Sequence, residues 1–380
     1  MTITLVLVSL LSMALSVGVP APAYSRGSSE SLSSAIGLAM RWLASNQTAN
    51  GSYGDFYDHW TAAAAYALWV NNSRSPQAAL SYTWLADRLN NGSSWFWGQY
   101  GEADVPGAML FSVAASQNLQ LAAIQNVSSR LFELQGSNGG FRGYYDPNIG
   151  DYGQNVASSV DTAMALWALA EARAIDESRR QGAIEYLISL QNPNGSFNLT
   201  RTMASDPIYS HAPEVVSITA LTLLALKAAS YNTDTRVSKA LDFLSTTTSS
   251  NFTGPDTSNS HVYSATLTAL ALNAFARTGD ASTVIAFIVS HQNPDGGYND
   301  KTRQSGTSNA LDTGWAAIAL QLVRTESEQA GNLDEGLRLN SVLIVGLIAA
   351  GVAVVVAGVS LYLRRTRPLP CRPCSRSRKE

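Results

Sequence analysis

One short pattern occurs four times in this 380-residue chain, and it limits the possible folds more than any other feature. Each copy has a glutamine, an Asn or Asp three residues later, then a glycine, a small residue and an aromatic residue. The copies span residues 47–53, 135–141, 191–197 and 292–298. A pattern that returns along a chain in this way is typical of supersecondary units that stack on one another.

The distances between the copies predict six repeats. The four glutamines are 88, 56 and 101 residues apart, so each long gap has room for one further repeat. Weaker copies lie in both long gaps, from Trp84-Leu85 through Trp95 and from Phe243-Leu244 through Phe252. The resulting period of roughly 44 to 57 residues is expected of units made of two helices.

Both helices of each unit are predicted by the spacing of apolar residues. The helix before the glutamine is amphipathic, as Ala183, Tyr186 and Leu190 show. The segment after the aromatic residue is apolar on every side, so we expect it to be buried on every side. Those segments are residues 62–69, 163–169, 218–226, 265–272 and 316–322. The predicted fold class is all-α: an (α/α)6 toroid of six two-helix repeats at residues 24–326, plus one C-terminal transmembrane helix.

The two ends of the chain predict export and membrane anchoring. Residues 1–23 combine an apolar, uncharged run with Ala21-Pro22-Ala23, which has the form of a signal-peptidase site. Residues 327–341 are interpreted as a juxtamembrane linker, and Val342–Leu363 contains 22 residues without a charge, about 33 Å as a helix. The basic residues of 364–380 favour a cytoplasmic tail. We predict a single-pass protein of the cell membrane with an extracytoplasmic N-terminal domain.

The placement of charges and cysteines excludes several classes of protein. The net charge of −3 is the sum of two parts of opposite sign, because the tail holds seven of the 25 basic residues and only one of the 28 acidic ones. The remaining part therefore carries −9, which argues against nucleic acid as a partner. Both cysteines, Cys371 and Cys374, lie in the tail, where palmitoylation and reduced thiols are both open alternatives. Eight Asn-x-Ser/Thr sequons suggest a glycoprotein; they begin at Asn46, Asn50, Asn71, Asn91, Asn126, Asn194, Asn198 and Asn251.

The Gln–Gly–aromatic repeat resembles the QW motif of squalene and oxidosqualene cyclases. The predicted double ring resembles their α/α toroid, which protein prenyltransferase β subunits share. The resemblance covers residues 31–326, nearly all of the predicted exterior part. It implies inner helices that begin at one end of the ring and line a central cavity for an isoprenoid-like molecule.

Alignment of the inner segments places five residues at one level of this ring: Trp60, Asp161, Ile218, Ser264 and Asp312. Asp161 and Asp312 are the candidate catalytic residues, because a buried carboxyl near aromatic rings can act as an acid. Helix capping is the alternative explanation for each of them.

The chemistry of the related enzymes is only partly matched. The cyclases carry an Asp-x-Asp-Asp-Thr-Ala segment whose middle aspartate donates a proton. The similar stretch here is 158–163, and Val160 stands at the donor's place. Prenyltransferase β subunits hold zinc with Asp, Cys and His, and Gly314 replaces the cysteine. Since the toroid has no cysteine, we predict no thiolate–zinc site, no thioester, no metal and no cofactor.

The candidate ligand-binding residues are aromatic and histidine side chains of the inner ring: His59, Trp60, Trp167, His261 and Trp315. We predict that the toroid binds an apolar or extended ligand and has lost cyclase and prenyltransferase chemistry. The first alternative is an (α/α)6 hydrolase or lyase acting on surface polysaccharide, since acidic and aromatic residues alternate in several loops. A divergent cyclase-like enzyme is the second. The sequence does not decide whether the chain is an enzyme.

Overall fold

The computed structural model describes residues 26–54, 58–91, 103–117, 121–143, 157–200, 212–248, 261–299 and 307–323. The described part is helical throughout, apart from turns and three isolated β-bridges. The labelled helices are α2 (Arg26–Asn46), α3 (Asp58–Asn71), α4 (Pro76–Asn91), α5 (Asp104–Ala115), α6 (Leu121–Leu134), α7 (Ser159–Glu171), α8 (Glu177–Ile188), α9 (Ala212–Ala228), α10 (Thr235–Thr248), α11 (Val262–Ala274) and α12 (Thr278–Ser290). One more helix spans residues 310–323.

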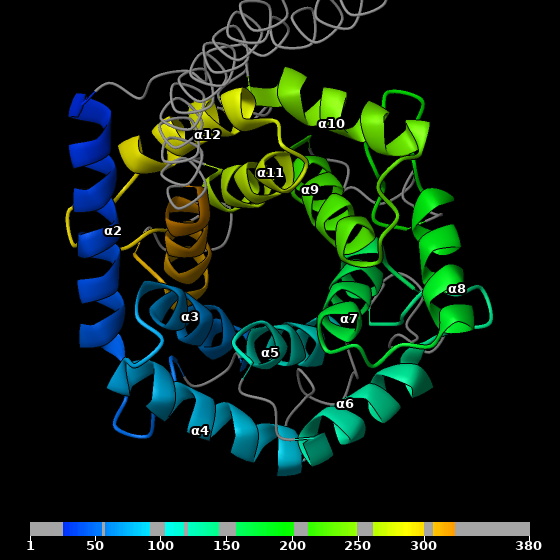
Figure 1. The fold of residues 1–380 in the computed structure, drawn as a ribbon, viewed down its shortest axis with the longest axis horizontal. Helices are drawn as coiled ribbons and strands as arrows, with labels where there is room; N and C mark the ends of the chain where they lie inside the picture. Colours follow the sequence, from blue (N-terminus) through cyan, green and yellow to red (C-terminus); the bar gives the residue numbers. More distant parts are fainter. Residues whose placement is uncertain are drawn as a thin grey trace, which may run out of the picture. The chain divides into compact units, whose positions relative to one another are not determined.

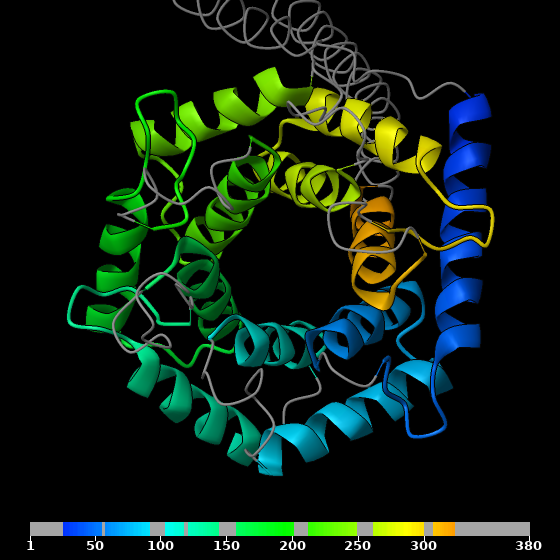
Figure 2. The ribbon, with the colours of Figure 1, turned by 180° about the vertical axis from the view of Figure 1, so that it is seen from behind.

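These helices form two concentric rings. The inner ring consists of α3, α5, α7, α9, α11 and the helix at 310–323, drawn in orange (Figure 1). The outer ring consists of α2, α4, α6, α8, α10 and α12 and surrounds the inner one in both views (Figures 1 and 2). Outer and inner helices alternate along the chain, so each repeat contributes one of each. Repeats one to six are α2–α3, α4–α5, α6–α7, α8–α9, α10–α11 and α12 with the helix at 310–323. The predicted all-α toroid of six two-helix repeats is confirmed.

Burial follows the sequence pattern of the two rings. The inner helix α7 buries every residue from Asp161 to Leu169, whereas the outer helix α8 buries only four. The apolar inner helices thus have neighbours on all sides, and the amphipathic outer helices present one face to solvent.

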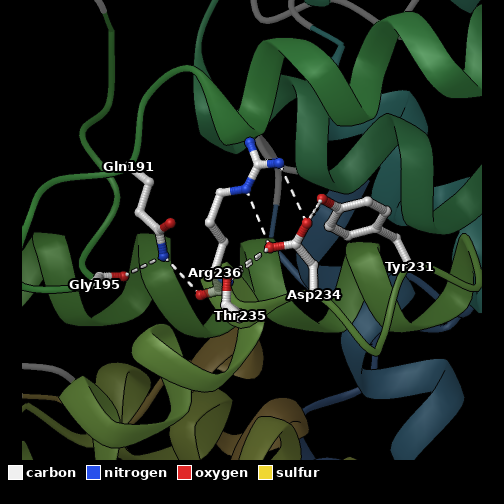
Figure 3. A network of polar contacts seen from close by, with 6 residues as sticks. All are labelled: Gln191, Gly195, Tyr231, Asp234, Thr235 and Arg236. Carbon is white, nitrogen blue, oxygen red and sulfur yellow. Dashed lines mark hydrogen bonds and ion pairs between the residues drawn. The ribbon is translucent and has the colours of Figure 1, made fainter.

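The glutamine of the repeat joins each unit to the next. In repeat four, the Gln191 side chain donates hydrogen bonds to the carbonyl of Gly195 in its own turn and to that of Arg236 in the next outer helix (Figure 3). The Gln135 side chain likewise donates hydrogen bonds to the carbonyls of Gly139 in its own turn and of Arg179 in the next outer helix. Gln47 and Gln292 repeat the arrangement with Gln77 and Ala35 as the partners in the next outer helix.

The turn after each glutamine has one conformation in all four copies. The Asn or Asp side chain accepts a hydrogen bond from the backbone N–H two residues later, which forms an Asx turn. The following glycine has a positive φ, from 83° to 95°. A Cβ at Gly139 would lie 2.1 Å from the carbonyl oxygen of Gly182, so only glycine lets the turn approach the next outer helix.

The last repeat closes both rings onto the first. Gln292 donates to the carbonyl of Ala35, and the Trp42 indole donates to Asp295 over 3.1 Å. On the inner side, Gln321 donates to the carbonyl of Ala67, and a Cβ at Gly314 would lie 2.7 Å from the backbone of α3. Gly314 therefore allows a close contact between the first and last inner helices.

Several predicted segments lie outside the described residues. They are the signal peptide at 1–23, the linker at 327–341, the transmembrane helix at 342–363, the tail at 364–380 and the turns of the two weaker copies. Within the described part, no helix has the length and apolar character needed to cross a bilayer.

Candidate functional site

A repeated hydrogen bond fixes the register of the inner helices at their N-terminal ends. In four repeats, the backbone N–H of the motif's aromatic residue donates to a threonine hydroxyl in the next inner helix. The pairs are Tyr53–Thr61, Phe141–Thr162, Phe197–Thr219 and Tyr298–Thr313, at 2.8–3.0 Å. The residues before these threonines are Trp60, Asp161, Ile218 and Asp312, which therefore occupy equivalent positions, as their alignment predicts. We call this region the N-terminal end of the inner ring.

Asp161 joins two neighbouring inner helices. Its Oδ1 accepts hydrogen bonds from the backbone N–H groups of Ala103 and Asp104, at 3.0 and 3.1 Å, where α5 begins. Its other oxygen accepts from the hydroxyl of Ser158, which is the N-cap of its own helix α7. The carboxylate thus serves as the missing cap of α5, whose N-cap residue Ala103 has no side-chain hydrogen bond.

Burial is the largest influence on the pKa of Asp161. The side chain is 5% exposed, and desolvation raises the pKa of its carboxyl group, while the three donors lower it by a smaller amount. A carboxyl with a raised pKa has one property of a general acid. Its oxygens, however, are already engaged with Ser158, Ala103 and Asp104.

Asp312 has a related environment in repeat six. Its backbone N–H donates to the side chain of Asn309 at 2.9 Å, and Asn309 donates back to the carboxylate at 2.6 Å. Asn309 therefore stands where Ser158 stands in repeat three. Each of the two candidate acids is bonded to the residue three positions before it.

Asp58 is a third buried carboxyl at this end. It begins α3 and accepts hydrogen bonds from the Arg88 guanidinium of α4, the shorter at 3.1 Å. Burial raises the pKa of the Asp58 carboxyl, and Arg88 offsets part of the rise. The ion pair links an inner helix to the next outer one.

His261 is the most unusual polar group at this end. It precedes α11 and is 1% exposed. Within the described part of the chain, neither of its ring nitrogens has a hydrogen-bond partner. His59 and Trp60 in the first turn of α3 are partly exposed.

The aromatic candidates meet at the centre of the ring. Trp167 of α7 and Trp315 of the helix at 310–323 come from opposite sides, yet their ring centroids are 5.9 Å apart. Phe111 of α5 lies 4.2 Å from Trp167 and 5.9 Å from Trp315. All three are buried, so side chains fill the centre at this level and do not line an open channel.

Exposure along the inner helices agrees with a filled middle. Apart from Tyr66, partly exposed side chains in the described inner helices occur near the helix ends. At the N-terminal end they include His59, Trp60, Asp104, Val160, Ser217 and Tyr263. These side chains are the accessible part of the candidate site, and the aromatic trio lies deeper.

Metal binding gains no support from the described residues. No group of three His, Cys, Asp or Glu side chains there has a geometry that could hold an ion. The prediction of no metal and no cofactor stays a prediction.

Comparison with known families gives one partial match. The A-macroglobulin TED domain matches residues 150–298, which is less than half of the chain. It is a different family from the one that the repeat resembles. No curated protein matches the sequence.

Solved structures share the architecture at low identity. A type II terpene cyclase from Scytonema, bound to geranylgeranyl dihydroxybenzoate, has a TM-score of 0.52 and 14% identity, covering 77% of this chain and 97% of that one. An unsaturated glucuronyl hydrolase specific for heparin has a TM-score of 0.60 and 12% identity, covering 79% and 98%. An α-amylase from Clostridium perfringens has a TM-score of 0.56 and 10% identity, covering 76% of this chain and 97% of that one. These similarities establish the α/α toroid fold and leave the function open.

Sequence reasoning overlooked three participants at the site. Phe111 belongs to the second repeat, whose degenerate motif obscured its inner helix, although the apolar residues 105–114 could have indicated it. Ser158 and Asn309 precede their aspartates by three residues, a capping spacing that could have been recognised.

Proposed function

We propose that this protein binds an apolar, isoprenoid-like or otherwise extended molecule with one polar end. The site would lie at the N-terminal end of the inner ring. The observation that carries the proposal is His261, a buried imidazole with two nitrogens and no partner in the described structure. A buried polar group without a hydrogen bond costs roughly 1–3 kcal/mol, so a ligand hydroxyl or carboxylate bonded to it would remove a penalty.

The N-terminal end of the inner ring offers apolar surface for the body of this ligand. Val160 and Trp167 are seven residues apart, which places them on one face of α7. Trp167 meets Phe111 and Trp315 on the ring axis. A molecule bound at the N-terminal end would therefore lie against Val160, and the packed aromatic side chains would form the floor of its site.

The aspartates support binding without acid chemistry. Asp161 is held by three donors that belong to two helices, and the position of the cyclase proton donor is occupied by Val160. In the proposal, Asp161 and Asp312 position helices and His59, Trp60 and His261 contact the ligand. The predicted export and single membrane anchor would place this site outside the cell.

Replacement of His261 tests the proposal. In the His261→Leu variant of the full chain, we expect unchanged or higher stability without ligand, because an unpaired polar group is removed. We also expect at least a tenfold loss of co-purifying apolar ligand, measured by organic extraction and mass spectrometry. His291→Leu is the matched control, because His291 lies in the outer ring, where it stacks on Phe287 and contacts its carbonyl. Equal ligand content in both variants and wild type would refute the role of His261.

A polysaccharide-degrading enzyme is the second candidate. It is supported by the fold similarity to the glucuronyl hydrolase and by the raised pKa of two buried carboxyls, Asp58 and Asp161. Most of the acidic and aromatic loop residues that suggest it lie outside the described residues. Hydrolysis or elimination of a glycan by the wild type, abolished in Asp161→Asn, would favour this candidate over simple binding.

A further inference from the structure

Two of the repeat turns have the sequence and geometry of glycosylation acceptors. Asn50-Gly51-Ser52 and Asn194-Gly195-Ser196 are sequons that occupy the Asx turns of repeats one and four. In both, the serine hydroxyl donates a 2.8 Å hydrogen bond to the asparagine Oδ1. Both asparagines are exposed, and within the described structure their amide nitrogens take part in no hydrogen bond.

We propose that Asn50 and Asn194 carry N-linked glycans. In this reaction the amide nitrogen forms a bond to the anomeric carbon of an oligosaccharide. The bond from that carbon to the phosphate of a lipid-linked donor breaks, the lipid phosphate leaves, and the amide proton passes to solvent. The hydroxyl–Oδ1 bond polarises the amide toward this loss, and the turn's own hydrogen bonds use Oδ1, so they survive the modification.

Two other sequons have amides that the fold uses. Asn198 and Asn192 exchange two side-chain hydrogen bonds, at 2.8 and 3.0 Å, so a glycan on Asn198 would remove an N–H and separate the pair. The amide of Asn46 donates to the carbonyl of Trp42 within α2. We therefore expect Asn198 and Asn46 to stay unmodified in the folded protein.

The two acceptors lie on opposite sides of the ring. Repeats one and four supply α3 and α9, which face each other across the centre (Figure 1). The turns of Asn50 and Asn194 lead into these helices, so the glycans would flank the N-terminal end of the inner ring on two sides. This inference depends on the predicted extracytoplasmic location and not on the nature of the ligand.

Site-specific mass spectrometry tests the inference. The full chain is produced in a eukaryotic secretory host, and glycosylated asparagines are labelled by enzymatic deglycosylation in H₂¹⁸O. We expect label at Asn50 and Asn194, and none at Asn198 or at Asn138, which occupies the same turn with Gly140 in place of serine. Ser52→Ala and Ser196→Ala should each remove one label, and Ser52→Thr should retain it.

Two results would overturn the inference. One is the absence of label at both Asn50 and Asn194. The other is label at Asn198 equal to that at Asn194 in folded, monodisperse protein. Neither outcome bears on ligand binding at His261, so the two proposals fail separately.

Discussion

The repeat turns and the N-terminal end of the inner ring differ in how strictly they repeat. All four turns have the same glutamine bonds, Asx turn and positive-φ glycine. In the four repeats with the full motif, the inner helices share the threonine that bonds the turn, and the residue before it changes from Trp60 to Asp161, Ile218 and Asp312. The comparison indicates that the turns maintain the ring, whereas the inner end is free to acquire a function specific to this chain.

The polar groups of the two regions also differ in how fully their hydrogen bonds are satisfied. Just before the outer helix α10, Asp234 accepts hydrogen bonds from Tyr231 and Arg236, and the Arg236 bonds hold the pKa of Asp234 well below its usual range (Figure 3). At the inner end, burial raises the pKa of Asp161, and His261 has no partner among the described residues. The glutamine amides and the Asn or Asp oxygens of the turns have hydrogen-bond partners, whereas the His261 imidazole at the inner end has none among the described residues.

The largest effect is expected from emptying the ring centre. Trp315→Ala should lower the free energy of unfolding by about 3–5 kcal/mol, because a buried aromatic side chain leaves a cavity beside Phe111 and Trp167. Trp84→Ala in the outer helix α4, where the side chain is only partly buried, should cost less than half as much. Urea unfolding measures both. Equal losses would contradict a packed centre.

The next largest loss of stability is expected from replacing a glycine of the repeat turns. Gly139→Ala should cost about 2–4 kcal/mol, because φ is positive and the new Cβ meets the Gly182 carbonyl. Gly279→Ala is the control, since a Cβ there meets nothing within 4 Å. Thermal unfolding of the pair gives the comparison. A Gly139→Ala protein as stable as Gly279→Ala would show that the turn does not fix the repeat spacing.

A smaller loss of stability is expected from replacing the glutamine of the repeat motif. Gln191→Ala removes two hydrogen bonds to backbone carbonyls and should cost about 1–2 kcal/mol. Gln181→Ala, on the exposed face of α8, should change stability by less than about 0.5 kcal/mol. Denaturant midpoints distinguish the two. If Gln191→Ala were neutral, its bonds to Gly195 and Arg236 would not join the repeats.

The smallest effect is a pH dependence at the inner end. Because burial raises the folded-state pKa of Asp161, its contribution to stability is complete below its unfolded pKa, near 3.8, and declines as the pH rises through the folded value. Asp161→Asn cannot ionise. The stability of wild type minus that of the variant should therefore fall as the pH rises above the unfolded pKa in urea titrations, and a rising difference would show that hydrogen bonding outweighs burial.

The toroid could be predicted because its determinants are local and repeated. Glycine at positions 51, 139, 195 and 296 follows from a turn that no other residue fits, and the inner helices follow from apolar periodicity. The same reasoning predicted six inner helices but did not locate that of repeat two, although its apolar residues 105–114 resemble residues 265–272 of repeat five, whose turn also lacks the full motif.

The arrangement of the site could not be predicted, since it depends on contacts between distant parts of the chain. Asp161 caps α5, which lies 57 residues earlier in sequence, and no pattern within 158–163 indicates this. The contact of Trp167 with Trp315 depends on ring closure. Burial of His261 with no hydrogen-bond partner among the described residues likewise becomes visible only in the folded chain.

A direct binding measurement tests the central claim. The full chain in lipid nanodiscs is titrated with geranylgeraniol, an apolar molecule with one hydroxyl, and with a glucuronic-acid oligosaccharide, against protein-free nanodiscs. We predict saturable binding of the isoprenoid alcohol at one site, weakened at least tenfold in His261→Leu and unchanged in His291→Leu. Saturable binding of the oligosaccharide alone, or no saturable binding of either, would contradict the assignment.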